Sequence, residues 1–246
     1  MNNQAEMTTQ TLFEELIEAR RSNRVFDTEH QMPEHIVATA LASALKSPNS
    51  SNMQMWEFVR VKSDDKRKAM VPICLGQSAA STASEFVVVV ARPDYWKTRS
   101  EFNYEKLKNE YGESSDKFAK VKSYYKDLMP KVYRNDALGI LGGLKRLMAT
   151  VVGLFRPMVR ELGKQDIMAT IHGSNSLASM TFMYAMTAQG YDTCPLGGFD
   201  SVRLKKLLNL PSSTEITMVI ACGKGTPSGI WGERHRVPYE EVVRTV

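Results

Sequence analysis

The sequence predicts an α+β fold in which helices wrap a small sheet within one domain. Three strand-like runs, rich in β-branched and aromatic residues, lie at 56–62, 85–91 and 215–221. A long apolar helical pattern runs from Asp166 to Gln189 and stops at Gly190. The chain has 246 residues, of which 43% are hydrophobic and 24% charged, and this suits one large globular domain.

The N-terminal elements carry recognisable start and stop signals. A capping box at Thr11–Glu14 predicts the start of the first helix, and Pro33 favours the first turn of the second. The run EFVVVVA at 85–91 is continuously apolar, which is typical of a strand buried on both faces. The expected order is helix 11–20, helix 33–46, loop 47–55, strand 56–62, helix 64–75 and strand 85–91.

A helical insertion that caps the core is expected over about residues 93–162. Its stretch from 137 to 155 is apolar, but Lys145 and Arg146 lie in the middle, where each charge costs roughly 2.5–3.5 kcal/mol in a bilayer. We therefore expect a buried or pocket-lining segment and no membrane span. The remaining elements are expected as helix 166–189, loop 193–199, helix 200–209, strand 215–221 and a short helix near Pro238.

Composition narrows the class of protein. The polar start MNNQAEMTTQ lacks the layout of a signal peptide, and Cys74, Cys194 and Cys222 form no CxxC pair, so we expect reduced thiols in a cytoplasmic protein. The pI is about 9.0, but lysines are interleaved with acids and no nucleic-acid recognition motif accompanies them. No metal or self-contained catalytic motif appears in the sequence, so a cofactor would carry the chemistry of an enzyme.

Two basic segments lie outside regular helix faces. RRSNR at 20–24 follows the end of a helix, and its guanidiniums and hydroxyl match phosphate oxygens. RHR at 234–236 lies in an irregular tail, where alternate residues of an extended segment point to the same side. Each segment is a candidate anion site and, with equal weight, a candidate for solvated surface.

Two loops are also candidates for ligand contact. PNSSN at 48–52 offers short polar donors and acceptors, but alone it indicates only a loop. TCPLGGF at 193–199 has paired glycines after a helix. That pattern indicates either a tight turn or a backbone that a flat ligand can approach closely.

Taken together and in this order, these pieces resemble the nitroreductase family of flavin mononucleotide (FMN) enzymes. The matching residues are RRSNRVFD (20–27), SPNSSNMQMWEF (47–58), Gln77, the helix end and loop at 182–200, and RHR (234–236). The insertion at 93–162 is not covered by any motif. The resemblance implies a small mixed or antiparallel sheet wrapped by helices around a long central helix. It also implies a homodimer with FMN at the subunit interface.

The resemblance implies a role for individual residues as well. The phosphate and the flavin edge would be met by residues from both ends of the chain: Arg20, Arg21, Ser22, Arg24, Arg234 and Arg236. The flavin ring would be met by Pro195, Leu196, Gly197 and Gly198, with a backbone N–H near N5, and Gln77 would hydrogen-bond the ring or the ribityl chain. The partner subunit would supply Pro48, Asn49, Ser50 and Asn52. No side chain would then act as a catalytic acid or base, because the flavin carries the hydride.

The implied activity is NAD(P)H-dependent reduction of a flat, electron-poor small molecule, such as a nitroaromatic or a quinone, by a ping-pong hydride mechanism. The donor is NADH or NADPH. Two alternatives keep the fold: flavin chemistry of a reductive dehalogenase or flavin-modifying kind, and flavin binding without catalysis. Two positions depart from the family's pattern, because Gly197 stands where some relatives carry an acid and Met55 stands where proline is common.

Overall fold

The computed structural model describes residues 8–134 and 140–246. Its sheet is antiparallel throughout, with the strand order β1-β2-β4-β3. The strands are β1 (Trp56–Val61), β2 (Glu85–Ala91), β3 (Asp192–Leu196) and β4 (Glu215–Gly223). All of β2 is buried, as its apolar run predicts. The structure therefore confirms the expected α+β class with a small sheet, and the sheet is antiparallel.

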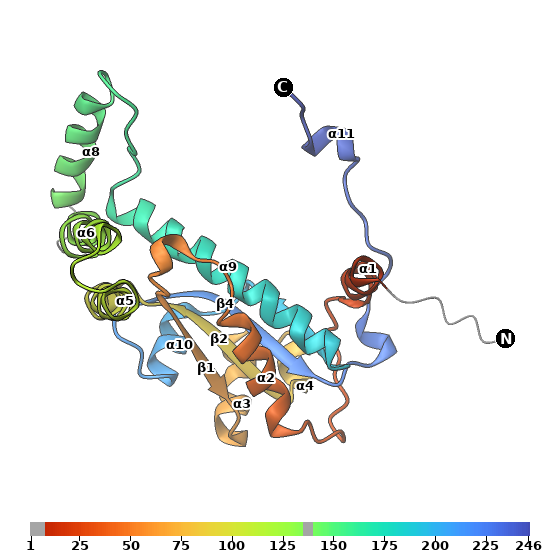
Figure 1. Ribbon diagram of the computed structural model, residues 1–246. Coiled ribbons are helices and arrows are strands. Elements are labelled where there is room, and N and C mark those ends of the chain that lie inside the picture. Colours follow the sequence, from red (N-terminus) through yellow and green to blue (C-terminus); the bar gives the residue numbers. More distant parts are fainter. Residues whose placement is uncertain (1–7, 135–139) are drawn as a thin grey trace.

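Helices cover both faces of this sheet (Figure 1). Because side chains alternate along a strand, β2 sends Val87 and Val89 to one face and Phe86 and Val88 to the other. The first face packs on α2 (Glu34–Ala44) and on the long α9 (Lys164–Ala188). The second face packs on α3, α4 and α10, which span Asp64–Ile73, Ser78–Thr82 and Ser201–Leu207. The ligand-contact candidates lie around the edge of this three-layer core.

Two expectations near the ends of elements are wrong. Helix α1 spans Thr9–Ala19 and is capped by the hydroxyl of Thr8, so the capping box at Thr11–Glu14 does not mark its start. The segment at 193–199 is not wholly a loop, because its first residues belong to β3, which pairs with β4. β3 is an edge strand, so the missing N–H of Pro195 leaves no ladder bond broken.

The expected insertion is helical in its described residues. It contains α5 (Trp96–Tyr111), α6 (Asp116–Lys122), a π-helical turn (Ser123–Leu128), α7 (Met129–Tyr133) and α8 (Ile140–Val152). Residues 135–139 of the insertion lie outside the described part of the chain. Met129 and Tyr133 pack with Ile167 and Met168 of α9, which anchors the insertion at the N-terminal end of that helix.

The expectation of a buried segment at 137–155 is only partly met. Residues 137–139 fall outside the described ranges, and within α8 Met148, Ala149 and Val152 do line a cavity. Other apolar side chains of this stretch, such as Leu144 and Phe155, are exposed to solvent. The burial prediction fails for these because α8 projects beyond the sheet (Figure 1), and other residues of the helix make its contacts with α7 and α9. Over residues 8–134 and 140–246, no helix meets the length and hydropathy needed to cross a bilayer.

The last short helix, α11, spans Tyr239–Val242 and follows Pro238, as expected. The C-terminal segment runs beside α1, so the two ends of the described chain lie on the same side of the molecule (Figure 1). This places the two basic segments close to each other.

Candidate functional site

The first basic segment leaves α1 as extended chain and attaches to the edge of the sheet. Ser22 forms a parallel bridge with Thr193 of β3, and the Asn23 N–H donates to the Thr193 oxygen at 3.2 Å. The Arg24 N–H donates to the Gly229 oxygen at 2.8 Å, which ties the segment to the C-terminal tail as well. The chain 20–24 is therefore held between β3 and the tail.

Asn23 is the buried anchor of this arrangement, a role that no sequence motif indicates. Its Nδ2 donates to the Thr226 oxygen at 3.0 Å, and its Oδ1 accepts from the Val25 N–H at 3.2 Å. The tail approaches so closely that a Cβ on Gly229 would lie 1.8 Å from the Asn23 Oδ1. A Cβ on Gly225 would lie 2.1 Å from its Nδ2. Only glycine fits at these two positions.

The second basic segment reaches the end of α1. Arg234 Nη2 donates to the main-chain oxygens of Ile17, Glu18 and Arg20 at 2.9, 3.2 and 3.1 Å. Its Nη1 lies 3.2 Å from the carboxylate of Glu18. The guanidinium thus satisfies carbonyls that a helix end leaves without intrahelical partners. Arg236 is exposed, and its Nη1 donates to the oxygen of His235 at 2.7 Å.

Guanidiniums from the two segments crowd one another. The pKa of Arg20 lies below its ordinary value, first because of burial and then because of the charges of Arg234, Arg236 and Arg21. Tyr184 acts in the opposite direction. Arg21 is held in place by a bond from its Nη2 to the Gly232 oxygen at 2.7 Å. Such a concentration of positive charge favours an anion beside it.

A cavity of about 330 Å³ adjoins this cluster at the edge of β3. It brings together residues that are far apart in the sequence: Ser22, Arg24, Gly76, Gln77, Ser78, Ala79, Cys194, Pro195, Leu196 and Trp231. Five of the sequence-predicted residues therefore share one cavity, namely Ser22, Arg24, Gln77, Pro195 and Leu196.

Gln77 shapes the loop after β3. Its Nε2 donates to the Gly198 oxygen at 2.8 Å and to the Cys74 oxygen at 2.9 Å. Gly197 and Gly198 are exposed, and a Cβ on Gly197 would meet nothing within 4 Å. The backbone of this loop is consequently open to a flat ligand on the side that a side chain would otherwise cover.

Trp231 is a member of the cavity wall that sequence reasoning missed. Its ring centroid lies 4.7 Å from the Arg24 Cζ, which is the geometry of a cation–π contact, yet 61% of the residue is exposed. The available signal was a lone tryptophan between glycines, three residues before Arg234. A large exposed aromatic in such a place offers a flat apolar surface to a ligand.

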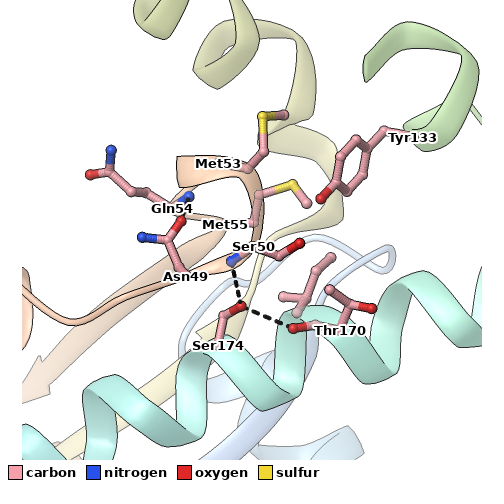
Figure 2. Close-up of a pocket in the computed structure, with 9 residues that line it drawn as sticks. Asn49, Ser50, Met53, Gln54, Met55, Tyr133, Thr170 and Ser174 are labelled. Carbon is pink, nitrogen blue, oxygen red and sulfur yellow. Dashed lines mark hydrogen bonds between the residues drawn. The ribbon is translucent and has the colours of Figure 1, made fainter. Parts of the chain in front are cut away.

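The loop 48–52 lies apart from this cavity. The Ser50 N–H donates to Ser174 Oγ of α9 at 3.2 Å (Figure 2). Asn49 Oδ1 accepts from the Gln54 N–H at 2.8 Å. Asn52 Nδ2 donates to Asn103 Oδ1 at 3.0 Å, and Pro48 is exposed. Asn49 and Ser50 line a separate, small cavity that shares no lining residue with the one at β3.

The backbone of this loop is strained. Ser51, Asn52 and Gln54 have φ angles of 55°, 51° and 47°, which place non-glycine residues in the left-handed region. Such conformations cost of order 1–3 kcal/mol each and persist where the surroundings hold them. Here the bonds from Ser174, Asn103 and the Asn49 side chain hold the loop. Its polar groups are thus presented in a fixed arrangement.

Comparison with known proteins identifies the class. The model of the nitroreductase family matches residues 17–224, so the chain belongs to this family. YodC of Bacillus subtilis (strain 168), whose name provisionally assigns it as an NAD(P)H nitroreductase, is 24% identical over 228 residues. The match covers 93% of this chain and 96% of that relative.

Solved structures share the fold. The structure of ydfN from Bacillus subtilis has a TM-score of 0.76 at 21% identity and covers 96% of this chain and 100% of its own. A structure from Exiguobacterium sibiricum, solved in complex with FMN, has a TM-score of 0.70 at 20% identity and covers 95% of this chain and 97% of its own. At these identities the likeness shows the fold alone.

Proposed function

We propose that the protein is an FMN-dependent oxidoreductase that takes electrons from NADH or NADPH. The observation that carries the proposal is the cavity at the edge of β3, where Ser22, Arg24 and Gln77 lie beside a cluster of guanidiniums. The family match and the FMN-bound structural neighbour support the choice of cofactor. The name of the relative YodC supports the choice of electron donor.

The basic cluster fits the phosphate of FMN. Arg20, Arg21 and Arg236 bring positive charge to one place, and Arg234 adds its own while it closes the end of α1. A phosphate monoester accepts several charge-assisted hydrogen bonds, each worth roughly 1.5–3 kcal/mol when shielded from water. The phosphate would therefore relieve the mutual repulsion of these guanidiniums and bind tightly.

The cavity fits the ring system. Its walls combine apolar surface from Leu196 and Trp231 with the amide of Gln77, which suits a flat ligand that has a polar rim. The exposed backbone at Gly197 and Gly198 would face the ring without an intervening side chain. A backbone N–H there would stabilise developing negative charge on the ring without proton transfer from a side chain.

Bound FMN would supply hydride transfer, from the nicotinamide to a flat, electron-poor small molecule such as a nitroaromatic or a quinone in ping-pong order. The residues of this chain would bind and orient the reactants. Gln77 would fix the position of the 195–198 loop, and Trp231 would cover one side of the cavity. No side chain is assigned as a catalytic acid or base.

We further propose that the protein is a homodimer in which the loop 48–52 completes the flavin site of the partner subunit. The loop presents ordered polar groups, but it does not line the cavity at β3 in its own chain. Leu12 and Phe13 of α1 and Leu177 of α9 are exposed apolar residues. Phe13 also contacts Tyr184, so α1 and α9 together present an apolar surface for a second copy.

The test is direct. The purified protein should be yellow, or become yellow with added FMN, and chromatography of the heat-released chromophore should give FMN. With a quinone or nitroaromatic present it should oxidise NADH or NADPH, and the sedimentation coefficient should be that of a dimer. A colourless protein that does not take up FMN would contradict the assignment. If the protein binds FMN but oxidises neither NADH nor NADPH, it is a flavin-binding protein without the proposed activity.

A further inference from the structure

Helix α8 turns its apolar face away from the molecule. Leu144, Leu147, Leu154 and Phe155, on α8 and the turn after it, are 58%, 63%, 73% and 86% exposed, and none of them lines the cavity beneath the helix. A helix on the surface of a globular protein normally has the reverse arrangement, with its apolar stripe on the core.

The opposite face of α8 carries the contacts that hold it. Lys145 Nζ donates to the main-chain oxygen of Val132 at 3.0 Å and also to that of Arg134, at the end of α7. Ala149, one turn further, is buried, and Arg146 Nη2 forms an ion pair with Asp166 of α9. These polar contacts fix the rotation of α8 about its own axis. The apolar face therefore points to solvent.

The segment after α8 folds back and lines the cavity beneath the helix. Arg160 Nη2 donates to the Gly153 oxygen at 3.1 Å, which holds the returning chain against the end of the helix. Met158 and Val159 of the returning chain line the cavity beneath α8, so they belong to the inner side of the hairpin and not to its outward face. We call residues 140–162 the α8 hairpin. It stands at the end of the molecule opposite the chain termini, beyond the N-terminal end of α9 (Figure 1).

The charges around this surface have one dominant sign. Between Ile140 and Lys164 the sequence holds a single acid, Glu161, and five cations: Lys145, Arg146, Arg156, Arg160 and Lys164. A contact between two copies of the hairpin across a two-fold axis would bring these cations together. Lys145 and Arg146 are engaged on the inner face, which leaves the exposed cations Arg156, Arg160 and Lys164 at the returning end of the hairpin. An apolar helix face accompanied by exposed cations is the pattern by which helices bind the interface of membranes that contain anionic lipids.

We propose that the α8 hairpin is a membrane-interface anchor that inserts its apolar face among the acyl chains of an anionic lipid surface. The helix has 13 residues. At 1.5 Å per residue it is about 20 Å long, shorter than the roughly 30 Å hydrocarbon core, so it lies in the interface and does not span. The cations Arg156 and Lys164 contact phosphate groups of the lipids. This anchor is separate from the cavity at β3 and does not rest on the function proposed for that cavity.

The experiment uses the full-length protein as purified, sedimented with vesicles. One set is an equimolar mixture of phosphatidylcholine and phosphatidylglycerol, and the other is phosphatidylcholine alone. The test variant is Leu154→Ser/Phe155→Ser, which changes outward side chains only. The matched control is Val202→Ser, which removes an equally exposed apolar residue on α10. Sedimentation velocity without lipid reports the oligomeric state of each protein.

The expected result is binding to the mixed vesicles that weakens with salt, little binding to phosphatidylcholine alone, and a loss of about tenfold or more in the test variant. The control should bind like the wild type. Absence of binding to the mixed vesicles overturns the proposal. Equal binding by the test variant and the control also overturns it, because another surface then binds lipid. A change of oligomeric state in the test variant, without lipid binding by the wild type, assigns the surface to a second copy.

Discussion

Arg234 donates a hydrogen bond to the main-chain oxygen of Arg20 at 3.1 Å, although 214 positions separate the two residues. The contact joins the second basic segment to the first at the end of α1. It brings two positive charges together, which is one reason that the pKa of Arg20 is lowered. The hydrogen bonds from Arg234 to the carbonyls at the end of α1 therefore keep the charges of Arg234 and Arg20 close together. A bound anion would reduce the repulsion between them.

Replacing Arg234 should affect the apoprotein as well as the cofactor site. Arg234→Ala removes the donors to the oxygens of Ile17, Glu18 and Arg20, so the free energy of unfolding should fall by about 1–3 kcal/mol. Urea denaturation of the FMN-free protein measures this. Arg244→Ala, in the exposed tail, is the control and should be neutral. Equal stability of both variants would show that the α1 contacts are not made in solution.

The proposed role of Arg20 in binding phosphate can be tested with riboflavin, which lacks the phosphate. Arg20→Gln should weaken FMN binding by roughly tenfold to a hundredfold, the equivalent of one charge-assisted hydrogen bond, and leave riboflavin binding nearly unchanged. Fluorescence titration with the two flavins gives both dissociation constants. Arg203→Gln, an exposed cation on α10, should bind both flavins like the wild type. A parallel loss for the two flavins would place Arg20 away from the phosphate.

Gln77 should control the loop after β3. Gln77→Ala removes the donor to the oxygens of Gly198 and Cys74, so the loop should loosen and FMN affinity should fall by roughly 1 kcal/mol, about fivefold. The FMN titration used for Arg20 measures the change, with the exposed Gln31→Ala as the matched control. Unchanged affinity in Gln77→Ala would show that the loop keeps its shape without these bonds.

Cys74 should make stability depend on alkaline pH. Burial raises the pKa of its thiol from 9.0 to about 11 in the folded protein. The unfolded chain therefore releases this proton first as the pH rises. The contribution of the buried, protonated thiol to the free energy of unfolding is fully present below pH 9 and is lost between about pH 9 and 11. Cys74→Ala should show a smaller decline of unfolding free energy over that window than the wild type. An identical decline in both proteins would show that Cys74 does not cause the loss of stability at alkaline pH.

The sheet was largely predictable because its central strands are strongly patterned. The apolar run of β2 starts and ends at Glu85 and Ala91 as expected, and β4 extends two residues past the predicted end at Ala221. β3 was missed because Pro195 and the following glycines indicate a turn. Only its place at the edge of the sheet, which the sequence does not give, makes proline acceptable there.

The cavity at β3 was predictable only in part. Ser22, Arg24 and Gln77 line it, whereas Arg20, Arg21, Arg234 and Arg236 do not, and the roles of all these residues toward a cofactor stay predictions. Asn23 and Trp231 were missed, since their importance depends on chain that folds back from about 200 positions away. The outward face of α8 was also missed, because periodicity locates an apolar stripe and does not say which way it turns.

The close packing of Asn23 against Gly229 has a consequence for how this protein can change by mutation. A side chain at 229 cannot be accommodated while Asn23 is present, because even a Cβ would overlap the amide. Removing Asn23 would not open that space, because the Cβ would still lie 2.5 Å from the backbone nitrogen of Val25, and it would give up the bond to Thr226. Glycine at 229 is therefore required by the backbone of the first basic segment as well as by the Asn23 side chain, and no substitution at 23 alone releases the constraint. Evolution of the tail is thereby coupled to a segment that lies about 200 positions earlier in the chain.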